Sequence, residues 1–163
     1  MKNQASEVIN NVAVFVMGLG FVGDATFKAP AIKFKKITDN TAAGEVDRTY
    51  GAVEKLEASC KLRVTNRVIF TAMIAQNNAG FIFTSSLTGD KIKGRRDVIK
   101  GSFDYEENEM KNGEVIEVDL TISPNYWIKE IDGLPMVEID MNKNVVRLSG
   151  RDLLAESRKA AGV

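Results

Sequence analysis

Ten residues near the middle of the chain alternate strictly between polar and apolar side chains. The apolar positions are Leu56, Ala58, Cys60, Leu62 and Val64, and the polar positions are Lys55, Glu57, Ser59, Lys61 and Arg63. Successive side chains of a β-strand point to opposite faces, so this pattern predicts a strand with one packed face and one face in water. Such a strand is typical of an antiparallel sheet that covers a core on one side only.

Further strands and two helices are predicted along the rest of the chain. Strands are expected over residues 12–17, 21–27, 31–37, 81–88, 98–106, 116–122, 126–131 and 136–139. Asn112-Gly113 and Asp132-Gly133 mark hairpin turns. Apolar residues at helical spacing predict an internal helix over 66–78, and Ser149 is a candidate N-cap for a C-terminal helix over 149–161. The predicted fold class is β-rich α+β: an antiparallel β-barrel or sandwich with one internal helix and a C-terminal helix.

The segment that precedes the alternating strand has no apolar period. Residues 38–50 contain Asp39-Asn40 and Gly44, and they are predicted to form a long loop. Long ordered loops often carry function. Because the 163 residues contain no linker, repeat or low-complexity tract, one domain is expected over residues 1–163.

Composition removes much catalytic and metal-binding chemistry. The chain has no histidine, and Cys60 is its only cysteine, so neither an intramolecular disulfide nor a cysteine metal cluster can form. The 22 basic and 22 acidic residues give a net charge of +0, whereas a sequence-reading DNA-binding protein would usually be basic. No segment resembles a signal peptide or a membrane span. A soluble protein made in the cytoplasm, with no membrane partner, is therefore expected.

Several local patterns have both a functional and a simpler structural interpretation. Residues 18–23 match the G-x-G-x-x-G spacing of dinucleotide sites, but strand-like residues follow them, which favours a glycine turn. Packing is favoured for Cys60 and Trp127, which lie within predicted strands. Solvated carboxylates are favoured over an acid–base pair for Asp104, Glu106, Glu107 and Glu109. We therefore expect no catalytic residue, no cofactor, no metal and no enzymatic activity.

Taken from end to end, the chain resembles the tail tube proteins of contractile-tailed bacteriophages, a family that also supplies the tubes of R-type bacteriocins. The resemblance covers roughly residues 9–163 and is most specific near the C-terminus. The motifs that carry it are Ile131-Asp132-Gly133, Val137-Glu138-Ile139-Asp140, Asn144-Val145-Val146-Arg147, Gly150-Arg151-Asp152-Leu153-Leu154 and residues 158–162, supported by Ile9-Asn10-Asn11-Val12, Gly23, Pro30 and Gly51-Ala52-Val53-Glu54-Lys55-Leu56-Glu57.

This resemblance implies a function and a set of partners. Members form homohexameric rings that stack into a tube inside a contractile sheath, and double-stranded DNA passes through the lumen without specific binding. The expected partners are further copies of the chain, the tail sheath protein, and baseplate and tail terminator proteins. The implied location is the tail of the virion, after assembly in the host cytoplasm. The alternatives are a DNA-free R-type bacteriocin or other contractile injection particle and, more remotely, a small-ligand-binding β-barrel.

Strand geometry offers an independent check of this implication. If six copies each contribute four strands to one shared β-barrel, about 24 strands with a tilt of about 40° give a backbone radius near 24 Å. After subtraction of side chains the lumen is roughly 36 Å wide, which admits a duplex about 20 Å across. Closure of the barrel also pairs every exposed strand edge.

Three groups of residues are candidates for function in such a tube. Contacts between rings are expected from Thr41, Ala42, Ala43, Gly44 and Glu45 in the predicted loop. Contacts with acidic side chains of another copy are expected from the basic cluster Lys91, Lys93, Arg95 and Arg96, at a predicted hairpin tip. Lumen-facing positions are expected for Asp104, Glu106, Glu117 and Asp119, opposed only by Lys100.

Overall fold

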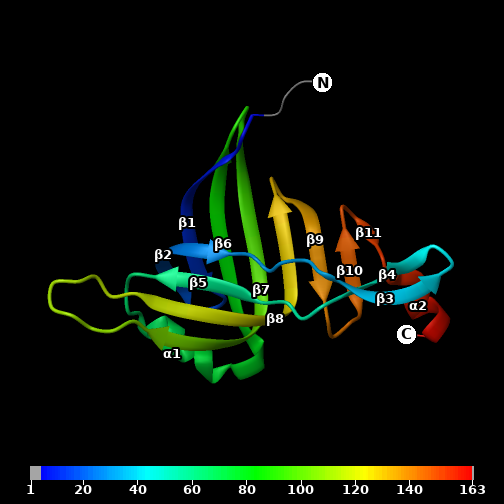
Figure 1. Ribbon diagram of the computed structural model, residues 1–163. Helices are drawn as coiled ribbons and strands as arrows, with labels where there is room; N and C mark the ends of the chain where they lie inside the picture. Colours follow the sequence, from blue (N-terminus) through cyan, green and yellow to red (C-terminus); the bar gives the residue numbers. More distant parts are fainter. Residues whose placement is uncertain (1–4, 163) are drawn as a thin grey trace.

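The computed structural model describes residues 5–162; Met1–Gln4 and Val163, which belong to the single domain expected over 1–163, lie outside the described residues. Its elements are β1 (Val8–Val16), β2 (Gly20–Lys28), β3 (Phe34–Thr41), β4 (Gly44–Val53), β5 (Ala58–Leu62), α1 (Arg67–Ile74), a 3-10 turn η1 (Gln76–Asn78), β6 (Ala79–Thr88), β7 (Ile92–Glu107), β8 (Val118–Ile131), β9 (Leu134–Asp140), β10 (Val145–Leu148), β11 (Arg151–Asp152) and α2 (Ala155–Ala161). Figure 1 shows this order along the chain. The predicted β-rich α+β class is confirmed.

Six strands close into an antiparallel barrel in the order β8-β5-β2-β1-β6-β7, with β7 paired back to β8. The alternation over residues 55–64 is confirmed for Leu56, Ala58, Cys60 and Leu62, which are buried, whereas Val64 is 44% exposed beyond the end of β5. Aromatic side chains fill the interior, including Phe81 and Phe83. Since closure pairs the strands within one subunit, the core does not depend on a second copy.

The internal helix α1 closes one end of the barrel. Asn66 is its N-cap, and its Oδ1 accepts a hydrogen bond of 2.9 Å from the Val68 N–H. The Asn66 side chain also donates to the Val22 carbonyl oxygen at 3.2 Å, which fixes the helix start on β2. Ile69 and Ala72 are the buried residues of α1. The helix predicted over 66–78 is thus present as α1 followed by η1.

Strand β8 belongs both to the barrel and to the sheet that extends beyond it. Its first residues pair with β5 and its last residues pair with β9, while β7 accompanies both parts. The β7–β8 register shifts between Lys100 and Gly101, and a Cβ at Gly101 would overlap the backbone of Ser123. Glycine is therefore required at this bend. Strands β9, β10 and β11 extend the sheet beyond the barrel, toward α2 (Figure 1).

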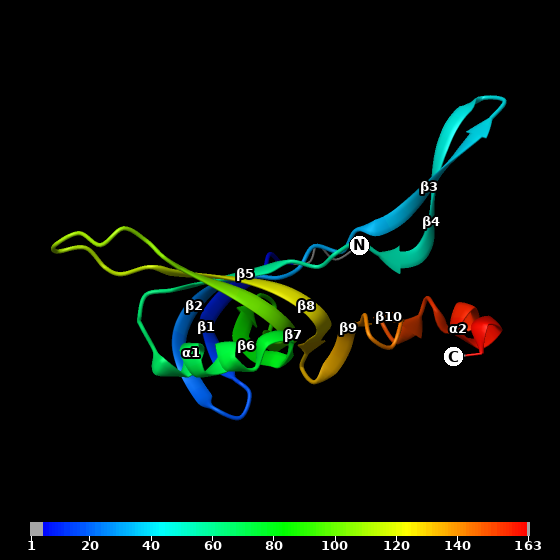
Figure 2. The ribbon, with the colours of Figure 1, turned by 90° about the horizontal axis from the view of Figure 1, so that it is seen from below.

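The prediction of a long loop over residues 38–50 is wrong. These residues form most of a hairpin, β3 and β4, which is a separate two-stranded sheet with Thr38 paired to Asp47 and Thr41 paired to Gly44. Figure 2 shows the hairpin projecting away from the barrel. Because nearly all of its side chains are exposed on both faces, its sequence carries no apolar alternation.

The start of the C-terminal helix also differs from the prediction. Ser149 and Gly150 have positive φ values and form the turn between β10 and β11, and α2 begins only at Ala155. Asp152, and not the predicted Ser149, anchors the start of the helix. Its Oδ1 accepts a hydrogen bond from the Leu154 N–H at 3.0 Å, and its carboxylate binds the Arg158 guanidinium. Arg158 holds the pKa of Asp152 below its ordinary value. The predicted helix end is confirmed, since Gly162 is a left-handed C-cap.

Candidate assembly surfaces

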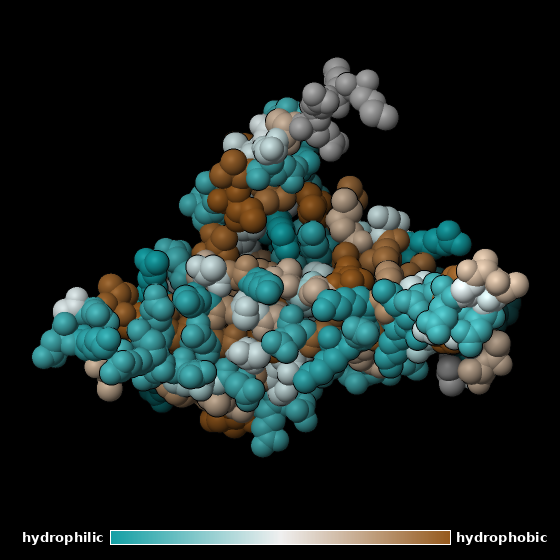
Figure 3. All heavy atoms as spheres, in the orientation of Figure 1, coloured by the Kyte–Doolittle hydropathy of each residue, from teal (hydrophilic) through white to brown (hydrophobic). Residues whose placement is uncertain are grey.

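The outer face of β2, β5, β8 and the end of β7 is a continuous polar surface. In the orientation of Figure 3 the middle of the molecule, over β5 and β8, is largely hydrophilic. The charged side chains of this face, which we call the polar wall, are Asp24, Lys28, Lys61, Arg63, Asp104, Glu106, Glu117 and Asp119. Acidic groups outnumber basic ones. The structure thus brings together all four residues predicted to face the lumen.

The base that opposes these carboxylates is Lys61 of β5. Its Nζ lies 3.6 Å from Glu117 Oε2, and Lys61 is directly opposite Asp119 in the β5–β8 register. Lys100, the base named from the sequence, lies instead over the ring of Tyr126, with 5.4 Å between Nζ and the ring centroid. Sequence reasoning missed Lys61 because the β5–β8 pairing joins residues far apart in the chain. The sequence did place Lys61 on the polar face of the alternating strand, and this was the one sign that it could share a face with the carboxylates.

The connection between β7 and β8 extends the polar wall into a protruding arm. Asn108 and Glu117 hold its neck: the Asn108 N–H donates to the Glu117 carbonyl oxygen at 3.0 Å, and the Glu117 N–H donates to Asn108 Oδ1 at 2.8 Å. Beyond this neck, Met110 and Val115 are 82% and 63% exposed. Figure 2 shows the arm pointing away from the β3–β4 hairpin, at the opposite end of the molecule.

The basic cluster is not confined to a hairpin tip. Only Lys91 lies in the β6–β7 turn, while Lys93, Arg95 and Arg96 belong to β7. Three of the four side chains meet carboxylates of the same chain: Lys93 lies 2.7 Å from Glu7, Arg95 2.8 Å from Asp97 and Arg96 3.8 Å from Glu130. Within residues 5–162, Lys91 has no ion-pair partner. A contact of this cluster with another copy stays a prediction, and Lys91 is its best-placed member.

Asp97 is the one buried charged side chain of the described residues, at 1% exposure. Its Oδ1 accepts a hydrogen bond of 3.0 Å from Trp127 Nε1, and its Oδ2 accepts one of 2.8 Å from Arg95 Nε. The packing predicted for Trp127 is confirmed, since it is 2% exposed. Its role as a hydrogen-bond donor was missed, because Arg95-Arg96-Asp97 has the composition of a solvated turn.

The residues proposed for contacts between rings lie at the tip of the β3–β4 hairpin. Ala42 and Ala43 form the turn, and Thr41, Gly44 and Glu45 are exposed beside it. The hairpin is stiffened by a 2.8 Å hydrogen bond from Thr38 Oγ1 to Asp47 Oδ1 and a 3.0 Å ion pair between Arg48 and Asp39. In the described part of the chain, each of its two strands pairs only with the other. Two strand edges are therefore free to meet another copy.

Comparison with known proteins agrees with this architecture. The sequence profile of the phage tail tube protein FII family matches residues 6–162. The chain belongs to this tail tube family. No curated protein matches the sequence significantly.

Among solved structures, the tail tube chain is similar to a component of the PVC extracellular contractile injection system, its sheath/tube terminator in the extended state, determined by cryo-EM. The TM-score is 0.56 at 11% sequence identity, over 74% of this chain and 93% of that chain. At this identity the likeness shows the fold alone.

The remaining features of the tail tube chain fit a structural role. Cys60 is 2% exposed inside the barrel, where burial, followed by the charge of Asp119, raises its thiol pKa to about 12. The thiol stays protonated at neutral pH, as expected for a small packing side chain. The glycines of residues 18–23 form the β1–β2 turn and enter a strand, with φ of 78° at Gly18 and 106° at Gly20. The predicted glycine turn is confirmed.

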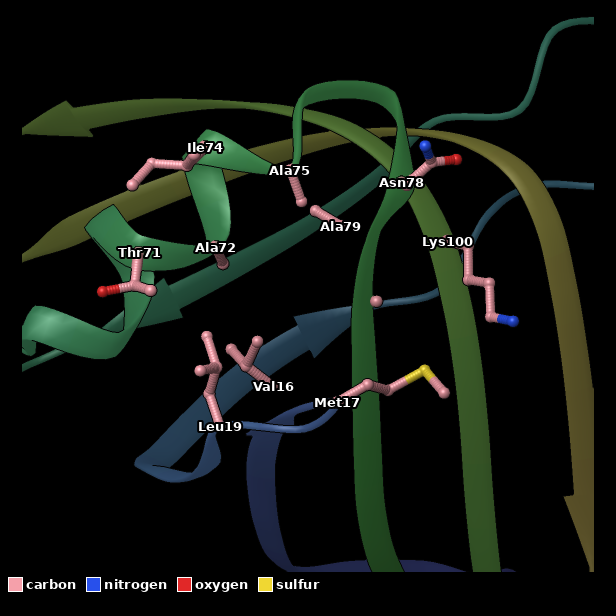
Figure 4. Close-up of a pocket in the computed structure, with 11 residues that line it drawn as sticks. Val16, Met17, Leu19, Thr71, Ala72, Ile74, Ala75, Asn78, Ala79 and Lys100 are labelled. Atoms are coloured by element: carbon pink, nitrogen blue, oxygen red, sulfur yellow. The ribbon is translucent and has the colours of Figure 1, made fainter.

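A pocket of about 620 Å³ lies between α1 and the β1–β2 turn, as Figure 4 shows. Its lining is mostly apolar, with Met17, Leu19 and Ile74 among the contributors and Lys100 as its one charged residue. No acid–base pair lines it. Among residues 5–162, no group of three or more acidic or cysteine side chains is placed to hold a metal ion. None of the helices described is long and apolar enough to cross a membrane.

Proposed function

We propose that this chain forms hexameric rings that stack into the inner tube of a contractile tail, through which DNA passes into the host. The family match over residues 6–162 carries the proposal. The polar wall on one side of a self-contained barrel and the β3–β4 hairpin that projects from it support it. The role is structural and not enzymatic. The chain assembles in the host cytoplasm and ends in the virion tail, in contact with sheath, baseplate and terminator proteins.

The polar wall is the surface that suits the lumen. It is built from β2, β5, β8 and the end of β7, which are neighbours in the sheet. Four strands from each of six subunits would make up a shared barrel of about 24 strands. The opposite side of the barrel, at α1 and the β1–β2 turn, exposes apolar residues such as Leu19 and Ile74. A water-filled channel favours the polar side over the apolar one.

Self-assembly tests the proposal directly. Purified protein at high concentration is expected to form six-membered rings or open-ended tubes, because head-to-tail contacts close into rings and ring stacking has no fixed end. Negative-stain microscopy and sedimentation would detect them. A single species of 17.9 kDa at every concentration and salt condition would refute the proposed function.

Replacing Asp104, Glu106, Glu117 and Asp119 with lysine is expected to reduce genome delivery at least about tenfold, with DNA retained in the tube. Each charge contributes only about 1 kcal/mol at a few Å in water, but stacked rings repeat it along the whole channel. The measurement is infectious titre together with DNA content of the tube after sheath contraction.

The matched control replaces four exposed acids away from the polar wall, Glu7, Asp90, Asp132 and Glu156, which gives the same net charge. This control is expected to deliver DNA normally. Normal delivery by the polar-wall variant itself would show that those four side chains do not face the lumen.

A second candidate function is the tube of a DNA-free contractile injection particle. The fold likeness to a PVC injection-system component favours it. Purified particles that contain the chain and kill or inject without any encapsidated DNA would establish it over the phage tail.

A further inference from the structure

The net charge of this chain is zero, but two of its segments carry opposite charges. Residues 104–119 contain seven acidic side chains and one basic one, whereas residues 28–36 contain four lysines and no acidic residue. The first segment comprises the end of β7, the arm and the start of β8, and four of its acids belong to the polar wall. The second, which we call the lysine segment, runs from the end of β2 to the start of β3. Figure 2 shows the arm at one end of the molecule and the lysine segment leading toward the other.

The lysine segment forms no ion pair among residues 5–162. Lys28, Lys33, Lys35 and Lys36 are exposed, and none has a carboxylate within ion-pair distance. Glu54 and Glu57 line the same shallow cavity as Lys28 and Lys33, whereas Lys35 and Lys36 lie outside that cavity. Four lysines within nine residues make this segment the densest run of unpaired positive charge in the described part of the chain.

The tip of the arm carries uncompensated negative charge. Of its two acids, Glu114 has no ion-pair partner among the described residues, and Glu109 meets only Lys111, at 3.8 Å, with the Glu109 side chain 81% exposed. Glu107, the last residue of β7, lies just before the neck, accepts a hydrogen bond from the Tyr105 hydroxyl and stays exposed. Because Asn108 and Glu117 hold the neck, these charges are presented on a preformed projection.

We propose that the arm tip of one copy docks on the lysine segment of the next copy and that this contact closes the ring. The occupant of the lysine segment is thus a second copy of this chain. This inference rests on the proposed function. A head-to-tail ring joins two different patches of the same subunit, and this chain carries its acidic arm tip and its lysine segment at two separate places. A two-fold contact between two arms would instead juxtapose like charges.

Docking also removes apolar surface from water. Met110 and Val115, on the same arm as the acids, are the apolar residues that a neighbouring copy would cover. Exposed charge pairs are individually weak and screened by salt, so they set register and partner choice while the covered apolar area adds stability.

Two charge-reversed variants test the contact. The arm variant carries Glu107→Lys, Glu109→Lys and Glu114→Lys, and the segment variant carries Lys33→Glu, Lys35→Glu and Lys36→Glu. Each alone is expected to raise the concentration needed for ring formation at least about tenfold, because attraction becomes repulsion at every interface. Mixed in equal amounts, they are expected to form rings again, with the two variants alternating. Sedimentation and native mass spectrometry measure ring size and composition.

The matched control for the segment variant is Lys143→Glu, Arg151→Glu and Lys159→Glu, which makes the same change in net charge at exposed basic positions elsewhere. It is expected to form rings as the unaltered chain does. Rings formed by both reversed variants, or loss of rings that mixing does not restore, would overturn the docking inference while leaving the proposed function intact. Absence of rings from the unaltered chain under all conditions would overturn both.

Discussion

Shortening the β3–β4 hairpin is expected to leave rings intact and to abolish their stacking into tubes. Residues 39–46 would be replaced by Asn-Gly, which is a two-residue hairpin turn that joins Thr38 to Asp47, a pair already in register. The base of the hairpin, at Phe34 and Val53, stays packed against the core, so the barrel loses no buried contact. Negative-stain images would show single rings in place of tubes.

The physical reason lies in what the hairpin exposes. The shortening removes the exposed tip, residues 41–45, and Val46, which is 44% exposed, on a projection that contributes little to the core. Apolar side chains and free strand edges on such a projection are stabilised by docking on another copy. We therefore expect the hairpin to contribute to stacking and not to folding.

A control with the full hairpin length separates loss of the tip from a general change in the hairpin. Asp39→Ser with Arg48→Ser removes the 3.0 Å ion pair within the hairpin and keeps the proposed contact residues at its tip. This control is expected to form tubes of normal length. If the shortened variant also forms tubes of normal length and yield, the hairpin does not connect rings.

The alternating strand and the hairpin show what a sequence pattern can reveal. Residues 56–62 alternate because one face of β5 packs on the core, so the strand was predictable from the sequence. Residues 38–50 form strands just as regular, but both faces are in water and no period marks them. Only their pairing with each other shows that they are strands, and no apolar period in the sequence signals that pairing. The surface that we propose for stacking is thus the part of the fold least visible in the sequence.

The polar wall shows the same limit at the candidate site. Exposure of Asp104, Glu106 and Asp119 followed from their parity in the predicted strands. The opposing charge of Lys61 did not, because the β5–β8 register brings Lys61 opposite Asp119, which is far from it in the chain. Sequence patterns assign a side chain to a face, and register decides what shares that face.

Replacing Asp97 with alanine is expected to destabilise the folded subunit by about 3 kcal/mol, which lowers the midpoint of thermal unfolding by roughly 6–12 °C for a domain of this size. The substitution removes the acceptor of the buried Trp127 Nε1–H and the partner of Arg95, whose side chain is 18% exposed. The loss of stability arises more from the unpaired donors of Trp127 and Arg95 than from loss of the ion pair itself. Urea denaturation at a dilute, non-assembling concentration measures it.

Variants of the same cluster distinguish this origin from a simple cavity effect. Asp97→Asn keeps an acceptor for Trp127 and should recover part of the loss, whereas Arg95→Met added to Asp97→Leu removes both charges and should recover part of it by packing. Asp104→Ala, an exposed carboxylate on the same strand, is the control, with an expected change within about 0.5 kcal/mol. If Asp97→Ala were as mild as Asp104→Ala, the hydrogen bonds of Trp127 and Arg95 to Asp97 would not stabilise the fold.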